Sequence, residues 1–185
     1  MEHQASEEYT FTANAIITRF VSEAKKKFEF SNDTLKFLVE DNVFIEADRQ
    51  DTFLNGLVAG FNFELPTAMH LLMLQIEHGI RKMAEECGSI VYKTDKNGVE
   101  ESLSLESILD LPDVKECLDE TFLFNLRLFY TSDYGFGMRN AVCHGLYSDK
   151  QLQTAQCLAV WWFSLHICCM YSTKLNERLL PQIKL

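Results

Sequence analysis

The chain has 185 residues, which fits one domain, or one domain with a helical extension, and leaves no room for a second catalytic domain. Hydrophobic residues make up 47% of it, and only 8 glycines and 3 prolines are available to break helices, so the composition favours an all-α fold. The net charge of −10 is spread over both halves of the chain and argues against strong non-specific binding to nucleic acid, which needs clustered lysine and arginine. Any contact with RNA must therefore be local.

The first apolar pattern predicts a helix over residues 10–28, with Phe11 and Phe20 among the side chains at near-helical spacing. The polar cluster at residues 31–34 predicts the start of a second helix. A third helix is expected over residues 49–60. This part of the chain carries no recognisable motif, and we interpret its apolar side chains as residues that pack in the hydrophobic core.

The strongest helix signal covers residues 64–87, with Pro66 in its first turn and Gly88 at its end. In helical projection, the face expected to point inward carries His70, Met73, Leu74, Glu77, Ile80, Arg81 and Ala84. Glu77 and Arg81 lie one turn apart, a spacing that favours an ion pair. Two interpretations stay open. The pair satisfies itself near the core, or it supports a functional site on a neighbouring helix.

Residues 89–101 predict a small β-hairpin, because a β-branched first strand is followed by an Asn-Gly turn. An isolated hairpin is only marginally stable, so we expect it to lean against the helices. Short helices are expected around residues 103–110 and 114–118, and a longer one near residues 120–130.

The loop expected over residues 131–137 contains Gly-Phe-Gly but lacks the spacing and the lysine of a phosphate-binding loop. Residues 155–171 form an apolar segment that is too short, and too often interrupted by polar residues, to span a membrane. We expect a buried central helix there, or one shared with a partner copy. His166 and Cys169 lie one turn apart on it without further ligands at metal spacing, so we interpret His166 as a packed core histidine.

The chain has six cysteines but no CxxC pair. They are Cys87, Cys117, Cys143, Cys157, Cys168 and Cys169. Most of them lie in apolar helical patterns, which is typical of reduced core residues and not of a disulfide framework or a zinc site. The acidic N-terminus lacks the apolar core of a secretion signal. The sequence therefore predicts an intracellular, cytoplasmic protein that binds no metal and no cofactor.

Chemistry concentrates between Gly137 and Gly145, in the string Gly-Met-Arg-Asn-Ala-Val-Cys-His-Gly. Arg139 supplies a permanent cation, Asn140 an amide and His144 a titratable base within about two helical turns. Gly145 is placed to end the helix in a left-handed conformation, which would leave His144 at an exposed helix end.

Such a site would cut RNA without a metal. His144 would take the proton of a ribose 2′-hydroxyl, Arg139 would hold the scissile phosphate, and Asn140 would orient the imidazole or the phosphate. Attack by the 2′-oxygen would leave a 2′,3′-cyclic phosphate. The same residues would equally serve to cap helix ends and satisfy buried carbonyls, so spacing alone leaves both interpretations open.

The segment from Arg139 to Gly145 resembles the Arg-x4-6-His motif of the HEPN superfamily of higher-eukaryote and prokaryote nucleotide-binding domains, including the polar residue directly after the arginine. A longer series of short sequence segments, spread over about residues 47–180, is similar to the C-terminal domain of endoplasmic-reticulum-membrane-associated RNA-degradation proteins and their bacterial relatives. That series consists of Phe63 to Leu72, Gln75 to Arg81, the hairpin, Leu109 to Pro112, the motif and the helix with Trp161 and Trp162.

The resemblance implies an all-α, HEPN-like helical bundle over residues 47–185 with a β-hairpin near residues 89–101, preceded by an N-terminal helical extension over residues 1–46. It also implies a homodimer in which two Arg/His motifs face each other. Many such domains are metal-independent endoribonucleases that act on RNA in toxin–antitoxin, phage-defence or RNA-processing settings.

Arg139, Asn140 and His144 match the motif and carry over as the candidate catalytic residues. Glu77 and Arg81 match the pattern of the branch and are candidates for a supporting role. Other members of the superfamily keep the fold without cutting RNA. The alternative is therefore a non-catalytic module for RNA or protein interaction and dimerisation, with an antitoxin or another regulatory protein as its partner.

Overall fold

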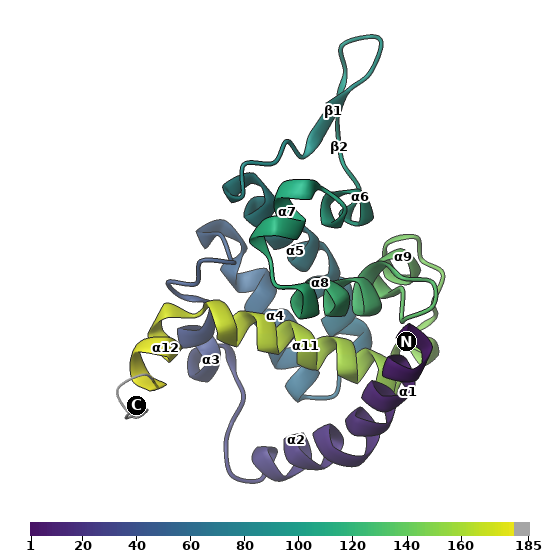
Figure 1. The fold of residues 1–185 in the computed structure, drawn as a ribbon. Coiled ribbons are helices and arrows are strands. Elements are labelled where there is room, and N and C mark those ends of the chain that lie inside the picture. The colour runs from purple at the N-terminus through teal and green to yellow at the C-terminus, as the bar shows by residue number, and fades with distance from the viewer. Residues whose placement is uncertain (180–185) are drawn as a thin grey trace.

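The computed structural model describes residues 1–179, which are mostly helical and carry one small antiparallel β-hairpin (Figure 1). The α-helices are α1 (Glu2–Thr12), α2 (Thr18–Lys25), α3 (Asn32–Val39), α4 (Gln50–Phe61), α5 (Leu65–Glu86), α6 (Leu105–Leu109), α7 (Pro112–Cys117), α8 (Glu120–Leu126), α9 (Met138–Cys143), α10 (Asp149–Leu152), α11 (Ala155–Tyr171) and α12 (Thr173–Leu179). Two π-helical segments, η1 (Ala13–Ile17) and η3 (Arg127–Thr131), a 3-10 turn, η2 (Ala47–Arg49), and the strands β1 (Tyr92–Thr94) and β2 (Glu100–Ser102) complete the order. The expected all-α fold with a small hairpin is confirmed.

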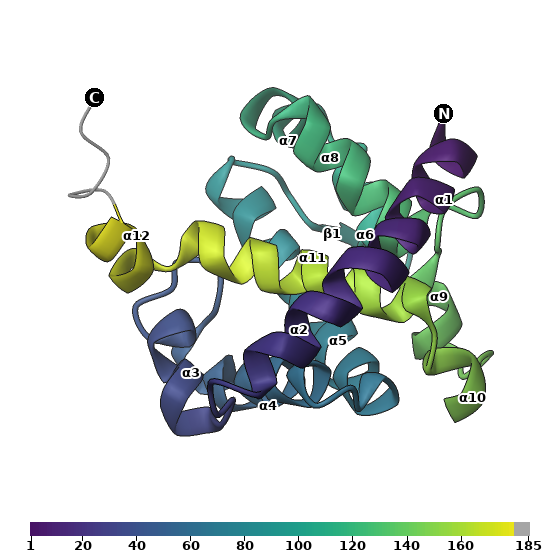
Figure 2. The same cartoon turned by 90° about the horizontal axis from the view of Figure 1, so that it is seen from below.

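Helices α4, α5 and α11 pack against one another, and α11 runs across the middle of the molecule in Figure 2. Trp161 of α11 is fully buried, and its indole N–H donates to the carbonyl oxygen of Leu57 in α4 over 3.2 Å. Gly60 of α4 makes this contact possible, because a Cβ atom at that position would overlap the indole ring. The buried helix expected over residues 155–171 is thus confirmed. Along residues 1–179, no helix is long and apolar enough to cross a membrane.

Helix α5 begins and ends where its sequence signals place it, with Pro66 in the first turn and Gly88 at a φ of +88° just after the end. The projected inward face is only partly correct. Glu77 is buried with 8% of its surface exposed, as expected, but Leu74 is 57% exposed. His70, also expected to point inward, is exposed as well. The reason is that the face of α5 that packs against α4, α9 and α11 is turned around the helix axis relative to the projected face, so Leu74 and His70 lie outside it.

The N-terminal helix buries a different face from the one expected. Its buried residues are Ala13, Ile17 and Val21, whereas Phe11 and Phe20 are 69% and 56% exposed. The segments α1, η1 and α2 follow one another without a break, and the wider π-helical turn of η1 changes the angular spacing of the side chains. The helix crosses α11 on the face that carries the smaller residues, which allows a close approach (Figure 2).

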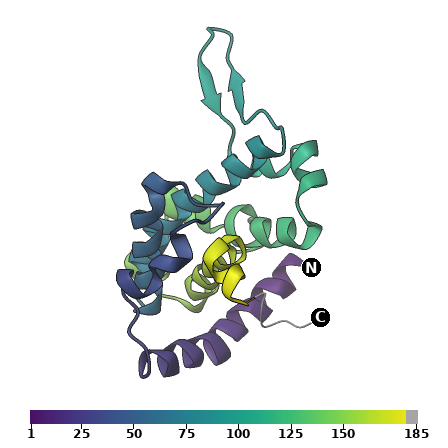
Figure 3. The ribbon, with the colours of Figure 1, turned by 90° about the vertical axis from the view of Figure 1, so that its left-hand side faces the viewer.

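The hairpin stands away from the helices (Figures 1 and 3). Its two strands pair as expected, and Gly98 in the turn has a φ of +81°. The Asp95 carboxylate accepts hydrogen bonds from the backbone N–H groups of Asn97 and Val99. All six strand residues are exposed, so the expectation that the hairpin leans on the helices is wrong. Turn contacts and the pairing of the two strands hold the hairpin, and the flanking residues Val91 and Leu103 pack against the core.

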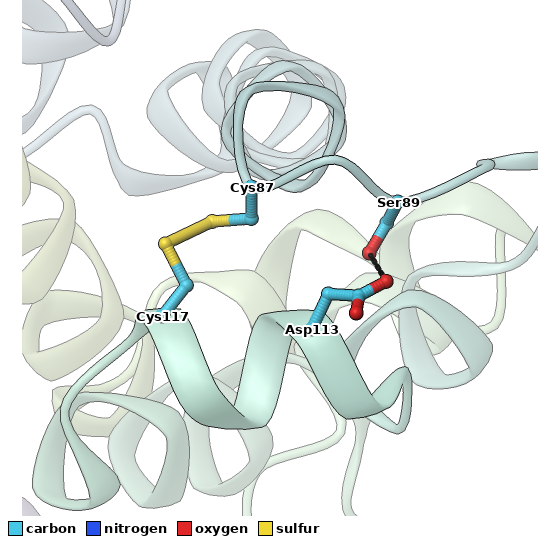
Figure 4. Close-up of a disulfide and its surroundings, with 4 residues drawn as sticks. All are labelled: Cys87, Ser89, Asp113 and Cys117. Atoms are coloured by element: carbon cyan, nitrogen blue, oxygen red, sulfur yellow. Dashed lines mark hydrogen bonds between the residues drawn. A yellow bond between two sulfur atoms is a disulfide. The ribbon is translucent and has the colours of Figure 1, made fainter.

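Cys87, after the end of α5, forms a disulfide with Cys117 at the end of α7 (Figure 4). Their Cα atoms lie 6.1 Å apart, and the Ser89 hydroxyl donates to the Asp113 carboxylate over 3.2 Å beside them. The expectation that these cysteines are reduced is therefore wrong, since pairing depends on how the fold brings α5 and α7 together across 30 positions of sequence. Structural disulfides are rare in the cytosol, so the cysteines no longer support the predicted cytoplasmic location.

His166 is exposed, which corrects its interpretation as a packed core histidine. It lies on the edge of a cavity between the N-terminal helix, α8 and α11, because these helices do not close over that side of α11. In the part of the chain that the structure describes, no group of three or more histidine, cysteine or acidic residues is arranged to hold a metal ion.

Candidate functional site

The motif folds as the short helix α9, which is held between two glycines in the left-handed conformation. Gly137 has a φ of +51° and Gly145 a φ of +63°. The Gly145 N–H donates to the carbonyl of Val142, and the next N–H donates to the carbonyl of Ala141 over 2.8 Å. The predicted left-handed end at Gly145 is confirmed. Met138 and its neighbours on one side of α9 are buried, which fixes the helix and leaves the polar residues on the other side.

Glu77 of α5 contacts Arg81, as predicted, and it also contacts Arg139 of the motif. Its Oε2 atom accepts a hydrogen bond from Arg139 Nε over 2.8 Å. Its Oε1 atom accepts from Arg139 Nη2 over 3.4 Å and from Arg81 Nη2 over 3.1 Å. Arg81 Nη2 also lies 3.4 Å from the carbonyl oxygen of Leu103. One carboxylate thus contacts two guanidinium groups, and the three side chains together carry a net charge of about +1 at neutral pH.

Glu77, Arg81 and Arg139 are partly shielded from water. Counted over the side-chain atoms alone, the exposed fraction is 11% for Glu77, 16% for Arg81 and 23% for Arg139. The hydrogen bond that Arg139 donates to Glu77 raises the pKa of Arg139 above its ordinary value, while partial burial opposes this effect. Arg81 Nε is buried without a hydrogen-bond partner among the described residues. The cationic charge of Arg139 is therefore permanent and its guanidinium plane is fixed.

Asn140 lies beside this network rather than beside the imidazole. Its Oδ1 atom accepts a hydrogen bond from Arg139 Nη1 over 3.3 Å. A guanidinium has five N–H donors. Three of those on Arg139 are committed to Glu77 and Asn140, so two remain for an anion. Asn140 also lines a cavity of about 330 Å³, together with Arg127, Ser132 and other polar residues.

His144 occupies the C-cap of α9 and its side chain is exposed, as expected. Its backbone N–H donates to the carbonyl of Asn140 over 3.1 Å, which places the two residues one turn apart. Within residues 1–179, the structure records no hydrogen bond between the His144 ring and the side chain of Arg139 or Asn140. The structure therefore joins Arg139, Asn140, Glu77 and Arg81 in one network and leaves His144 at its edge.

Cys143 is a neighbour of Arg139 that the sequence reasoning did not single out. It follows Arg139 by one helical turn, which is the signal that could have found it. Partial burial raises the pKa of the Cys143 thiol, although the charge of Arg139 acts in the opposite direction. A raised pKa leaves the thiol protonated near neutral pH, which argues against Cys143 as a nucleophile.

Comparisons of the chain with protein-family models, with curated proteins and with solved structures gave no match.

Proposed function

We propose that the chain is a metal-independent endoribonuclease of the HEPN type that acts as a homodimer. The observation that carries the proposal is the arrangement along α9. Glu77 fixes the guanidinium of Arg139 at the start of the helix while two N–H groups stay free, and the imidazole of His144 is exposed at its end. A fixed cation and an exposed base are the parts that cleavage through a ribose 2′-hydroxyl needs.

In the proposed reaction, neutral His144 removes the proton of the 2′-hydroxyl. The 2′-oxygen then attacks the adjacent phosphorus, and the bond from phosphorus to the 5′-oxygen breaks. Arg139 stabilises the negative charge that grows on the non-bridging oxygens. The products are a 2′,3′-cyclic phosphate and a 5′-hydroxyl, once the leaving oxygen has taken up a proton. Asn140, Glu77 and Arg81 act as positioning residues, since their contacts fix the plane of the Arg139 guanidinium.

The homodimer follows from the number of proton-transfer groups. The reaction needs one group to take the proton of the 2′-hydroxyl and one to protonate the leaving oxygen. The motif of one chain contains a single imidazole, and its arginine cannot exchange protons near neutral pH. A second copy that presents its own His144 to the same phosphate would supply the missing group.

The test is cleavage of a mixed RNA substrate in EDTA by the wild type and by His144→Ala. We expect the variant to lose at least about 10²-fold in rate, as for other general bases. His70→Ala is the matched control, because His70 is also exposed but lies outside the motif. Equal cleavage by the wild type and His144→Ala, or cleavage by neither, would overturn the proposal.

Subunit mixing tests the dimer. Under the proposal, each cleavage uses His144 of both copies, so a heterodimer of wild type and His144→Ala is inactive. Mixing the wild type with an excess of His144→Ala, with partial unfolding and refolding to exchange subunits, should therefore lower the activity per wild-type chain, whereas an excess of His70→Ala should not. A wild type that sediments as a monomer at active concentrations, or an activity per wild-type chain that is unchanged in the exchanged mixture with His144→Ala, would contradict a shared site.

One observation favours a second function. Arg139 forms its strongest contact with buried Glu77, which suits a structural ion pair as well as a phosphate site. The alternative is a non-catalytic interaction module that binds RNA, or an antitoxin or other regulatory protein, without cutting. It predicts that the wild type binds its partner and leaves RNA intact, and that Arg139→Ala lowers the melting temperature.

A further inference from the structure

A cavity of about 340 Å³ lies between the N-terminal helix, α8 and α11, and no residue of α9 lines it. Figure 2 shows the N-terminal helix crossing α11, with α8 alongside. Both π-helical segments of the described chain contribute to its wall, η1 through Ile17 and η3 through Phe129. Such segments are rare and occur frequently at functional sites. Two of them at one cavity mark it as a candidate binding site.

The wall of the cavity is built largely from aromatic rings. Phe129 stacks on Phe163 with ring centroids 4.7 Å apart, and Tyr9 lies 4.8 Å from Phe129. Phe122 and Trp162 line it as well. Aromatic faces pack well against another flat ring, and the volume is near the lower end of the about 300–1,000 Å³ that small-molecule sites occupy. The shape and lining therefore suit a planar ligand of about two fused rings.

A few polar groups at one side of the cavity could contact the polar or charged part of a ligand. The Tyr9 hydroxyl donates to Asn125 Oδ1 over 3.0 Å, which leaves the Asn125 amide N–H groups free for a ligand. Asp119 stands at the edge of the cavity, and one of its oxygens accepts the backbone N–H of Phe122 over 3.0 Å. Among residues 1–179, the lining contains no lysine or arginine, and His166 at the rim is its one histidine. The Asp119 carboxylate is the one carboxylate among these lining residues, and its negative charge favours a cation.

We propose that this cavity binds a small aromatic cation, with its ring against Tyr9, Phe129 and Phe163 and its ammonium group beside Asp119. Face contacts with the rings also favour a positive charge. This site is separate from the proposed ribonuclease site, and the inference does not depend on Arg139 or His144.

Three probes that share one ring system test the proposal, each titrated against the full chain by ligand-observed NMR. Tryptamine carries a cation, indole is neutral and indole-3-acetate carries an anion. We expect affinity to fall in that order, with at least a tenfold difference between tryptamine and indole-3-acetate. Equal binding of the three probes, or no binding of any, would overturn the proposal.

Two variants locate the binding. Asp119→Asn keeps an N-cap acceptor and should abolish the preference for tryptamine over indole, whereas Asp48→Asn makes the same charge change outside the cavity and should not. Met170→Trp fills one edge of the cavity and should weaken all three probes at least tenfold. Leu146→Trp, at another exposed hydrophobic position, should leave them unchanged. Equal effects of a variant and its control would show that the probes bind elsewhere.

Discussion

Glu77→Gln tests the arginine network directly. The substitution keeps the size of the side chain and removes the one charge that faces both Arg81 and Arg139. Those guanidinium groups lie 3.1 Å and 2.8 Å from the carboxylate oxygens, so both lose their ionic partner at once. The oxygen of the glutamine amide can still accept hydrogen bonds, but an NH2 donor replaces the second carboxylate oxygen, and the neutral amide cannot compensate two positive charges.

The expected loss follows from the burial of the network. Removing one partner from a buried ion pair costs about 3–5 kcal/mol, because the remaining charge is left uncompensated. The two arginines keep 16% and 23% of their side-chain exposure, so water screens part of this cost. We expect Glu77→Gln to lower the free energy of unfolding by about 2–3 kcal/mol, against a total of about 5–15 kcal/mol for most domains.

Urea unfolding followed by circular dichroism measures this change, with an unchanged slope showing that two-state unfolding persists. The control is Glu85→Gln on the same helix, which removes an ion pair with Lys82 whose side chains are 32% and 42% exposed. Because exposed pairs contribute little, its unfolding midpoint should match the wild type. Equal midpoints for Glu77→Gln and Glu85→Gln would refute the role of Glu77 in holding the two arginines.

Three further predictions concern the rest of the fold. Gly60→Ala places a methyl group where the Trp161 indole packs and should cost about 1–3 kcal/mol in urea unfolding; unchanged stability would contradict the close packing of α4 on α11. Replacing Cys87 and Cys117 by serine should cost about 3–4 kcal/mol for a separation of 30 residues, and should abolish the sensitivity of the wild type to dithiothreitol; a wild type that is already insensitive would mean that the disulfide does not form. Burial raises the pKa of Tyr130, so the unfolded phenol ionises first and stability falls as the pH rises above about 10. Tyr130→Phe should cost about 1 kcal/mol at neutral pH and lose stability less steeply above about pH 10; parallel pH profiles would contradict the neutral buried phenol.

Local signals predicted the boundaries of several elements, although the first helix begins at Glu2 and ends at Lys25 instead of covering residues 10–28. Ser31 accepts the N–H of Thr34 at the start of α3, Pro66 opens α5 and Gly145 ends α9, and each of these effects acts within one turn of the chain. The hydrophobic face of the N-terminal helix was mispredicted, because the π-helical turn at Ala13–Ile17 and the crossing of α11 are not visible in the spacing of the apolar residues.

The sequence predicted two groups of site residues, but not the contact between them. The motif residues and the pair of Glu77 and Arg81 each have a helical spacing that the sequence displays. The hydrogen bond that joins them connects residues 62 positions apart, so it depends on the packing of α9 against α5. The disulfide between Cys87 and Cys117 was missed for the same reason, since two cysteines without a spacing motif become partners only through the fold.

The most direct test of the proposed activity is the chemistry of the products formed in EDTA from one RNA and from the same oligonucleotide with a 2′-deoxyribose at the cleaved position. Mass spectrometry of the fragments identifies the new ends. Under the proposed mechanism, we expect a 2′,3′-cyclic phosphate and a 5′-hydroxyl from the RNA, and no cleavage at the deoxyribose. Fragments with a 5′-phosphate, or equal cleavage of both substrates, would contradict attack by the 2′-oxygen.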